Sequence, residues 1–274
     1  MTAGKTPVDI MRVIAGTAHA ARDIAAEEEP LEIRLEGAPF VVIMRTPGAD
    51  SALTAGFLLS ERLIAEAQDV GTIRSCTGPD GTKAANVINV TLAPHAAARA
   101  RDALAARRFV TTTSACGVCG RQTIDDLLTD LTPLPVRWRI RADVISALPD
   151  VLRGAQAVFD ATGGLHAAGL FDTTGRLLVS AEDVGRHNAV DKVIGTQVLM
   201  EQLPLDDRML VVSGRASYEL VQKALVARIP LLAAVSAPSS LAIDLAQRGG
   251  LTLLGFVRGG GFNIYTGAER VELS

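Results

Sequence analysis

Two cysteines, Cys116 and Cys119, lie three residues apart in the stretch TTTSACGVCG, and the chain has only one other cysteine, Cys76. A Cys-x-x-Cys pair can bind a metal, cycle between dithiol and disulfide, carry sulfur as a persulfide, or pack as two small apolar side chains. The segment is rich in glycine and hydroxyl side chains. This composition favours an accessible loop over a buried apolar pair.

Zinc is one alternative for the cysteine pair. A structural zinc site usually has four Cys or His ligands, whereas this chain has a single Cys-x-x-Cys, with Cys76 in a separate predicted hairpin. Zinc deaminases use a PCxxC pair together with an upstream HxE. Here Ala115 precedes Cys116, and no HxE occurs in the sequence. The sequence therefore argues against a zinc site and excludes deaminase chemistry.

Redox exchange and sulfur carriage are the two other chemical alternatives. A strand before the pair and a helix after it are typical of thioredoxin-type sites, where a helix N-terminus lowers the thiol pKa. Gly117 and Gly120 instead predict an adaptable loop, and the flanking elements do not resemble a compact thioredoxin domain. Sulfur carriage needs an accessible thiolate on a segment that can move between donor and acceptor. The residues alone leave both alternatives open.

A second group of candidate residues lies in five segments that combine glycine or serine with a donor or a cation. The segments are TGGLH (162–166), AEDVGRHN (181–188), SGRAS (213–217), SAPSS (236–240) and FVRGGGFN (256–263). Glycine lets a ligand approach the backbone, helix N-terminal amides accept anions, and arginine pairs with phosphate in a bidentate manner. Each segment alone is a turn or a helix cap, but together they predict one composite phosphate or nucleotide site. None matches a P-loop or a GxGxxG fingerprint.

The histidines of these segments could take part in the same site. His187 and Asp191 are four residues apart on a predicted helix, so they share a face and could form a His–carboxylate pair or a surface ion pair. His166 follows a double glycine and could reach the same pocket. Neither histidine has metal-ligand spacing to another one.

The elements that position these residues follow from the sequence pattern. Residues 1–30 are polar and weakly patterned, which predicts a loosely ordered leader. Residues 31–135 predict a smaller α+β part that ends in the cysteine loop and a following helix. A segment with two prolines, LTPLPVRWRIRADV, links this part to residues 136–274. There, short apolar strands alternate with helices, which predicts a largely parallel sheet between helices in an α/β/α core.

Composition narrows the class of protein. The 274 residues are 48% hydrophobic and 4% aromatic, and the formal net charge is −3. This charge argues against a general surface for nucleic acid, although not against a local basic pocket. An odd, small number of cysteines does not build a disulfide framework. The sequence predicts no signal peptide and has no apolar run long enough to span a membrane, so we expect a soluble cytoplasmic protein.

Taken together, the motifs resemble the FdhD family of formate dehydrogenase accessory sulfur carriers. The motifs that carry this resemblance are RTPGADSALTAGFLLSERLI, SACGVCG, TGGLHAAGLF, EDVGRHNAVDKVIG, SGRASYELVQKA, PLLAAVSAPSSLAIDLA and GFVRGGGFNIYTG. The resemblance runs from about residue 31 to residue 266. The Cys-x-x-Cys pair and the EDVGRHNAVDK motif, occurring together in one chain, make this resemblance specific.

The resemblance implies a fold and a function. It implies a homodimer whose larger domain has a cytidine-deaminase-like α/β/α core without deaminase chemistry. It also implies that the protein takes sulfur from a cysteine desulfurase and passes it to the molybdenum bis(molybdopterin guanine dinucleotide) cofactor, which activates formate dehydrogenase. A thiol-disulfide redox protein and a cofactor chaperone that transfers no sulfur are the alternatives.

The same resemblance assigns roles to residues. By the family pattern Cys116 forms the persulfide and Cys119 supports it. The cofactor-binding residues that we infer are Gly163, Gly164, His166, Arg186, His187, Arg215, Ser239, Phe256, Val257, Arg258, Gly259, Gly260 and Gly261. Other members of the family often carry larger or basic residues where this chain has the three glycines 259–261. Arg258 is therefore the one cation of that loop.

Overall fold

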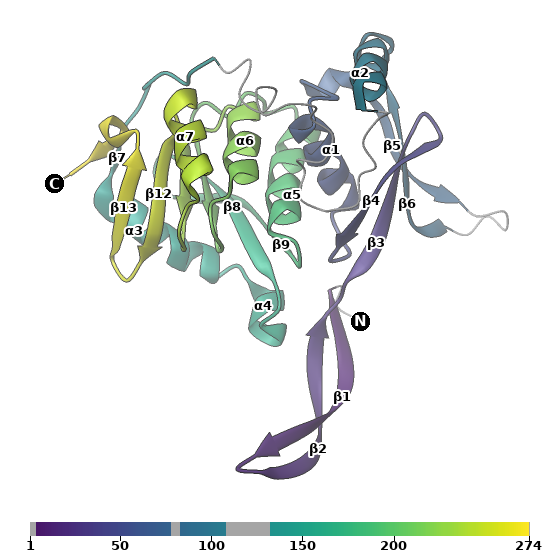
Figure 1. Cartoon of the computed structure of the whole chain (residues 1–274), viewed down its shortest axis with the longest axis vertical. Helices are drawn as coiled ribbons and strands as arrows, with labels where there is room; N and C mark the ends of the chain where they lie inside the picture. The colour runs from purple at the N-terminus through teal and green to yellow at the C-terminus, as the bar shows by residue number, and fades with distance from the viewer. Residues whose placement is uncertain (1–3, 78–82, 108–131, 274) are drawn as a thin grey trace.

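The body of the protein is built on a six-stranded and a four-stranded β-sheet with helices packed on them, and a β-hairpin projects away from this body (Figure 1). The computed structural model describes residues 4–77, 83–107 and 132–273. Cys116 and Cys119 lie outside these ranges. Cys76 lies within them and is a partly buried free thiol. The mixed α/β class expected from the sequence is confirmed.

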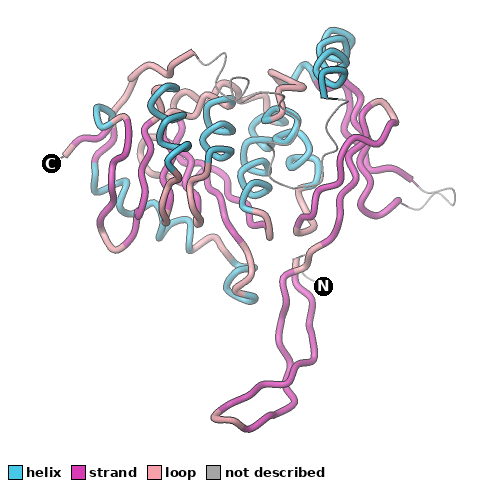
Figure 2. The backbone as a smooth tube through the Cα atoms, in the orientation of Figure 1, coloured by secondary structure: helices cyan, strands magenta, loops and turns pink. Residues whose placement is uncertain are grey.

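The projecting hairpin is formed by β1 (Lys5–Ile14) and β2 (Thr17–Ala26), which pair in antiparallel register (Figure 2). Ala15 and Gly16 connect the strands, both with positive φ, as a two-residue hairpin turn requires. The structure thus differs from the loose leader that we expected over residues 1–30. Backbone pairing along ten residues of each strand supplies the order that the weak side-chain pattern did not predict.

A four-stranded sheet with the order β4-β3-β6-β5 follows the hairpin. Its strands are β3 (Glu29–Leu35), β4 (Ala38–Arg45), β5 (Val70–Thr77) and β6 (Lys83–Leu92). The helices of this part are α1 (Asp50–Ser60), the short η1 (Ala67–Asp69) and α2 (Pro94–Arg107). The α+β character expected for residues 31–135 is therefore present in their described part, while the helix expected after the cysteine loop lies outside the described residues.

The main sheet has six strands in the order β13-β12-β11-β10-β8-β9. They are β8 (His166–Asp172), β9 (Leu177–Asp183), β10 (Arg208–Val212), β11 (Leu231–Ala234), β12 (Thr252–Arg258) and β13 (Gly261–Thr266). Only β10, β11 and β12 are parallel to their neighbours in this group, whereas β8, β9 and β13 pair in antiparallel fashion. The expectation of a largely parallel sheet was wrong, because the outer strands β8, β9 and β13 run antiparallel to their neighbours. The hairpin that the sequence predicts over residues 165–183, with its turn at Thr174 and Gly175, is present, and a second tight turn at Gly259–Gly260 folds β13 back on β12.

Helices cover both faces of the main sheet. One face packs on α5 (Arg186–Leu199), α6 (Tyr218–Val226) and α7 (Ser240–Gly249) through a core shared with α1. The other face packs on α3 (Ala142–Arg153), whose buried Ile145, Leu148 and Leu152 contact a separate apolar cluster. A short helix, α4 (Ala157–Thr162), follows, and β7 (Ile140–Arg141) pairs with β14 (Val271–Glu272) near the η3 turn (Ala268–Arg270).

The smaller part and the main sheet share one apolar core. Helix α1 crosses α5 so closely that a Cβ at Gly56 would overlap the backbone carbonyl of Asp191. A Cβ at Gly195 would likewise overlap the carbonyl of Ala52. Glycine at both positions is therefore what allows the two helix backbones to touch.

Candidate functional site

The five glycine- and serine-rich segments gather at one edge of the main sheet, the edge at which the parallel strands β10, β11 and β12 end. Strand β8 runs opposite to β10, so His166 at its start lies at the same edge as Ser213, which follows the end of β10. Backbone hydrogen bonds then link neighbouring segments: Ser213 donates to Ala167, Ser236 to Gly214 and Phe256 to Ser236, at 3.0, 3.3 and 3.1 Å. The spatial grouping that the sequence predicted is present.

One half of the EDVGRHNAVDK motif is structural. The Asp183 carboxylate is 0% exposed and accepts hydrogen bonds from the amides of Thr46 and Gly185 and from the Asn188 side chain. The Lys192 ammonium lies 2.7 Å from the same carboxylate. A buried charge with this many partners holds β9, α5 and the loop after β4 together.

Asp191 belongs to the same structural half. Its carboxylate accepts two hydrogen bonds of 2.8 Å from Lys223 on α6 and one of 2.8 Å from Ser60 on α1. The predicted alternatives of a His187–Asp191 pair and of a surface ion pair were both wrong. The helix turns Asp191 inward, where it joins three helices, while His187 takes a different partner.

The partner of His187 is Glu219 at the start of α6. The His187 Nε2 lies 3.7 Å from Glu219 Oε2 and 3.4 Å from Ser217 Oγ. Partial burial opposes ionisation of the Glu219 carboxyl, but hydrogen bonds from His187 and Ser217 outweigh it and lower its pKa to about 2. Glu219 is therefore a carboxylate at neutral pH and anchors the His187 ring.

His166 lies half-buried in a basic environment. Its ring lies against Gly214, where an added Cβ would come within 3.3 Å of Nδ1. Burial is the main cause that lowers the pKa of His166, and the positive charges of Arg186, His187 and Arg215 add to this shift. His166 is consequently favoured in its neutral form, as a hydrogen-bonding group among cations.

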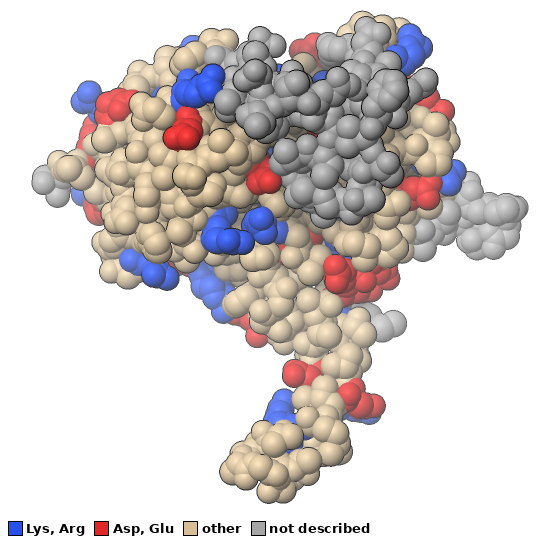
Figure 3. Space-filling model, viewed as in Figure 1, with Lys and Arg blue, Asp and Glu red and all other residues tan. Residues whose placement is uncertain are grey.

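Three arginines give this edge its positive charge. Within the described residues, Arg186, Arg215 and Arg258 form no ion pair, and the Nε of Arg186 is buried without a hydrogen-bond partner. Arg258 lies over the ring of Phe256, 5.4 Å from its centroid. In Figure 3 basic side chains gather along the lower edge of the body, beneath α5 to α7. Unpaired guanidinium groups at one edge indicate a site for an anion.

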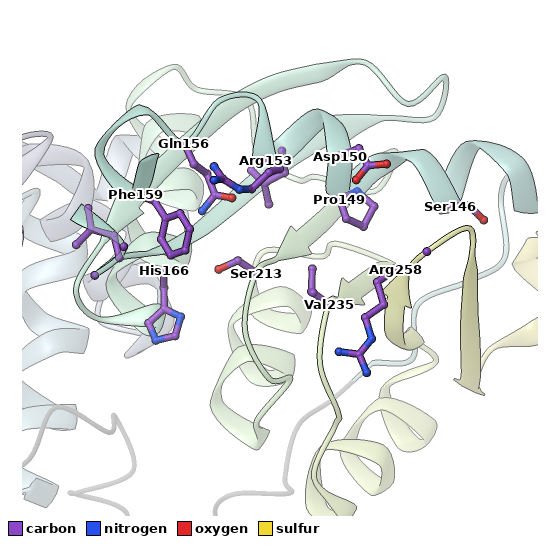
Figure 4. A pocket seen from close by; sticks show the side chains of 15 residues that line it. Ser146, Pro149, Asp150, Arg153, Gln156, Phe159, His166, Ser213, Val235 and Arg258 are labelled. Atoms are coloured by element: carbon purple, nitrogen blue, oxygen red, sulfur yellow. The ribbon is translucent and has the colours of Figure 1, made fainter. Parts of the chain in front are cut away.

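A cavity of about 540 Å³ opens beside this edge, on the side of the sheet that α3 covers (Figure 4). The predicted site residues that line it are Gly163, Gly164, His166, Arg258 and Gly259. Its volume falls within the range of small-molecule pockets. The Ser146 hydroxyl donates to the carbonyl of Gly260 at 3.3 Å, which ties α3 to the β12–β13 turn at one end of the cavity.

The remaining predicted residues lie elsewhere at the same edge. Ser239 caps α7, since its hydroxyl accepts a 3.3 Å hydrogen bond from the Ala242 amide. Val257 points into the apolar core, whereas Phe256 is half-buried with a φ of 53°. An added Cβ at Gly259, Gly260 or Gly261 would meet nothing within 4 Å, so there is open space beside these three glycines.

The sequence prediction missed the wall of the cavity that α3 and α4 form. Its residues are Ser146, Pro149, Asp150, Leu152, Arg153, Gln156 and Phe159. The spacing of Ile145, Leu148 and Leu152 is that of an amphipathic helix and could have revealed α3. Two prolines before it and Pro149 within it concealed the pattern.

The described residues contain neither a cluster of metal ligands nor a helix that could cross a membrane. No group of three His, Cys, Asp or Glu side chains in these ranges is arranged to hold a metal ion. None of the helices in the same part of the chain has the length and apolar character of a membrane span.

Comparison with known proteins places the chain in a family. The model of the FdhD/NarQ family matches residues 26–272. Proteins named sulfur carrier protein FdhD from Streptomyces coelicolor and Nocardia farcinica are 49% and 51% identical to the chain, over 96% and 92% of it and 94% and 89% of their own lengths.

A solved structure agrees with this assignment. The crystal structure of a protein described as a formate dehydrogenase accessory protein from Desulfotalea psychrophila superimposes with a TM-score of 0.77 at 25% identity. The match covers 98% of this chain and 100% of that one. Sequence and structure together show that the chain belongs to the FdhD/NarQ family.

Proposed function

We propose that this protein is a sulfurtransferase that carries persulfide sulfur from a cysteine desulfurase to the molybdenum bis(molybdopterin guanine dinucleotide) cofactor, for the maturation of formate dehydrogenase. Relatives that are about half identical over most of the chain bear the name sulfur carrier protein. We further propose that it works in the cytoplasm as a homodimer. Both of these points rest on the family resemblance.

The observation that carries the proposal is the basic edge of the main sheet. A cofactor with two guanine dinucleotides has two pyrophosphates, which need cationic and amide donors. Arg186, Arg215 and Arg258 supply guanidinium groups that no described acidic side chain neutralises. The adjacent cavity gives room for an organic part of the ligand. Charge and space at this edge therefore suit the proposed acceptor as a bound substrate.

The sulfur step uses the cysteine pair. The Cys116 thiolate attacks the outer sulfur of the donor persulfide, the donor S–S bond breaks, and the donor leaves as a thiolate while Cys116 becomes a persulfide. Attack of the Cys119 thiolate on the Cys116 sulfur then releases the outer sulfur as hydrosulfide for the acceptor. This second step closes a Cys116–Cys119 disulfide, which a cellular dithiol reduces.

Mass spectrometry of the intact protein tests the carrier role. The protein is incubated with a cysteine desulfurase, pyridoxal phosphate and free cysteine, beside Cys116→Ala and Cys119→Ala variants. We expect a gain of one sulfur mass that reductant removes and that Cys116→Ala abolishes. No gain, with desulfurase activity verified in the same tube, would refute the carrier role.

Activation of formate dehydrogenase separates the alternatives. If the protein were a cofactor chaperone that transfers no sulfur, the Cys116→Ala variant would still activate formate dehydrogenase. If it is a sulfur carrier, this variant would not activate the enzyme. A redox protein would show a reversible Cys116–Cys119 disulfide at cytosolic potentials without a persulfide on Cys116, so thiol trapping across glutathione ratios is read together with the sulfur mass.

A further inference from the structure

The hairpin of β1 and β2, residues 5–26, extends into solvent as an arm whose tip carries large apolar side chains (Figure 1). Five large apolar side chains in the described parts of the chain are more than 60% exposed, and three of them are Met11, Val13 and Ile14 at this tip. Exposed apolar residues that are scattered singly need no explanation, whereas neighbours at one tip indicate an interaction surface.

One face of the tip is apolar. Met11 and Val13 lie on the same face of β1, because side chains alternate along a strand, and each pairs in register with an alanine of β2. Toward the body, the same face carries an exposed ion pair between Asp9 and Arg22 at 3.3 Å. The apolar patch therefore has a charged border, which is the arrangement of a protein–protein interface.

The opposite face of the tip is cationic. Arg12 pairs in register with His19, and Ile14 lies on the same face. Residues 10–21 contain no Asp or Glu, and Arg12 forms no ion pair with any residue that the structure describes. A partner that matches this tip offers an apolar patch with carboxylates beside it.

The root of the arm is fixed beside the ligand cavity. The Lys5 ammonium donates a 2.9 Å hydrogen bond to the carbonyl of Ala157 in α4. A Cβ added at Gly164, which lines the cavity, would lie 3.3 Å from the Cβ of Ala26 at the end of β2. From this root, strands of ten residues reach about 33 Å. Figure 3 shows the arm and the basic side chains on the same lower side of the molecule, so the arm flanks the edge proposed to bind the ligand.

This position determines what the arm meets. A protein that takes the ligand from the basic edge must approach that edge, and even a small domain is about 30 Å across, so it contacts an arm that is rooted there. A second copy of the chain suits this place poorly, because its own ligand edge would bring Arg186, Arg215 and Arg258 toward a cationic tip. Location and charge therefore favour the protein that receives the ligand.

We propose that the arm is a docking element for the enzyme that receives the ligand, formate dehydrogenase in its cofactor-free form. The apolar face of the tip contacts an apolar patch of that enzyme, and Arg12 faces carboxylates at the border of the patch. This inference rests on the proposed function, in which the ligand of the basic edge is destined for formate dehydrogenase.

Calorimetry with the full chain tests the arm, and the probe is formate dehydrogenase from the same organism, prepared without its cofactor. Met11→Glu places a charge on the apolar face, so we expect it to weaken binding at least about tenfold. Arg12→Glu should also weaken binding and should reduce the loss of affinity that added salt causes.

Met200→Glu is the matched control. Met200 is 61% exposed, close to the 65% of Met11, but it follows the end of α5 that lies opposite Arg186. This variant should bind the cofactor-free enzyme as the wild type does. Pyrophosphate affinity and persulfide formation on Cys116 should be unchanged in Met11→Glu, which also shows that the variant is folded.

Three results would overturn the inference. The first is a wild type that takes up sulfur but does not bind the cofactor-free enzyme, and the second is equal binding by Met11→Glu and Met200→Glu. The third is a smaller assembly of Met11→Glu in sedimentation, which would assign the arm to a second copy of the chain. Docking that depends on the arm, in a protein that takes up no sulfur, would instead retain the arm and refute the carrier role.

Discussion

Charged side chains around helix α5 form two groups: a buried group where the helix packs against the core, and a basic group at its N-terminal end. On the inner side, Asp183, Asp191, Lys192 and Lys223 are buried and each has an oppositely charged partner within 2.8 Å. At the N-terminal end, Arg186 is one of several cations without an acidic partner in the described ranges. The paired charges fix how the buried elements pack, whereas the unpaired cations at the surface are available to bind an anion. One short motif thus contains both a structural and a binding element.

The largest expected effect comes from breaking a buried pair. Lys192→Ala leaves the Asp183 carboxylate without its cation in a place that water does not reach, so we expect a loss of about 3–5 kcal/mol in the free energy of unfolding. Urea denaturation measures this loss. The exposed Arg215→Ala should stay within about 0.5 kcal/mol of the wild type. Similar losses in the free energy of unfolding of the two variants would contradict the distinction between the buried, paired charges and the unpaired cations at the surface.

The close crossing of α1 and α5 is the next most sensitive feature. Gly56→Ala places a methyl group into the backbone carbonyl of Asp191, so the helices must separate. We expect a loss of about 1–3 kcal/mol or more, measured by thermal or urea denaturation.

Gly154→Ala is the matched control for this change. Gly154 ends α3 with right-handed helical angles, and an added Cβ there makes only ordinary contacts. It should be neutral or slightly stabilising. Equal losses in both variants would show that the helix crossing is not tight in solution.

Removing a cation from the edge should reduce binding and leave stability nearly unchanged. Arg258→Ala is expected to weaken pyrophosphate binding by roughly tenfold, as the loss of one charge-assisted hydrogen bond does. Calorimetry measures the affinity, and the melting temperature serves as the control. Raising the salt concentration should weaken binding less in the variant than in the wild type. An unchanged affinity would remove Arg258 from the anion site.

The smallest expected effect concerns Glu219, the partly buried carboxylate that pairs with His187. Its pKa is near 2 in the folded protein and 4.5 in the reference state, so its contribution to stability is present above about pH 4.5 and is lost as the pH falls toward 2. Glu219→Gln should therefore be less stable than the wild type at pH 7, by below about 1 kcal/mol. The difference should shrink between pH 4.5 and 2. A difference independent of pH in urea denaturation would contradict this assignment.

The accuracy of the sequence prediction depended on how local each signal was. The short apolar strands, helices α5, α6 and α7 and the five polar segments at one sheet edge were all predicted, because periodicity and strand order suffice for them. Helix α3 was missed because Pro149 and the preceding prolines hide its pattern. The pairing of His187 with Glu219 was also missed, because these residues are far apart in the chain.

The sequence by itself determined the α/β class, the family motifs and the gathering of glycine, serine and arginine beyond the strand ends. Only the tertiary structure decided which polar residues face inward and which face the site. Within EDVGRHNAVDK, Asp183 and Asp191 pair with side chains on other elements, whereas Arg186 has no ion-pair partner among the described residues. Local sequence cannot encode this choice, because burial and pairing of a charge depend on residues that folding brings together from distant parts of the chain.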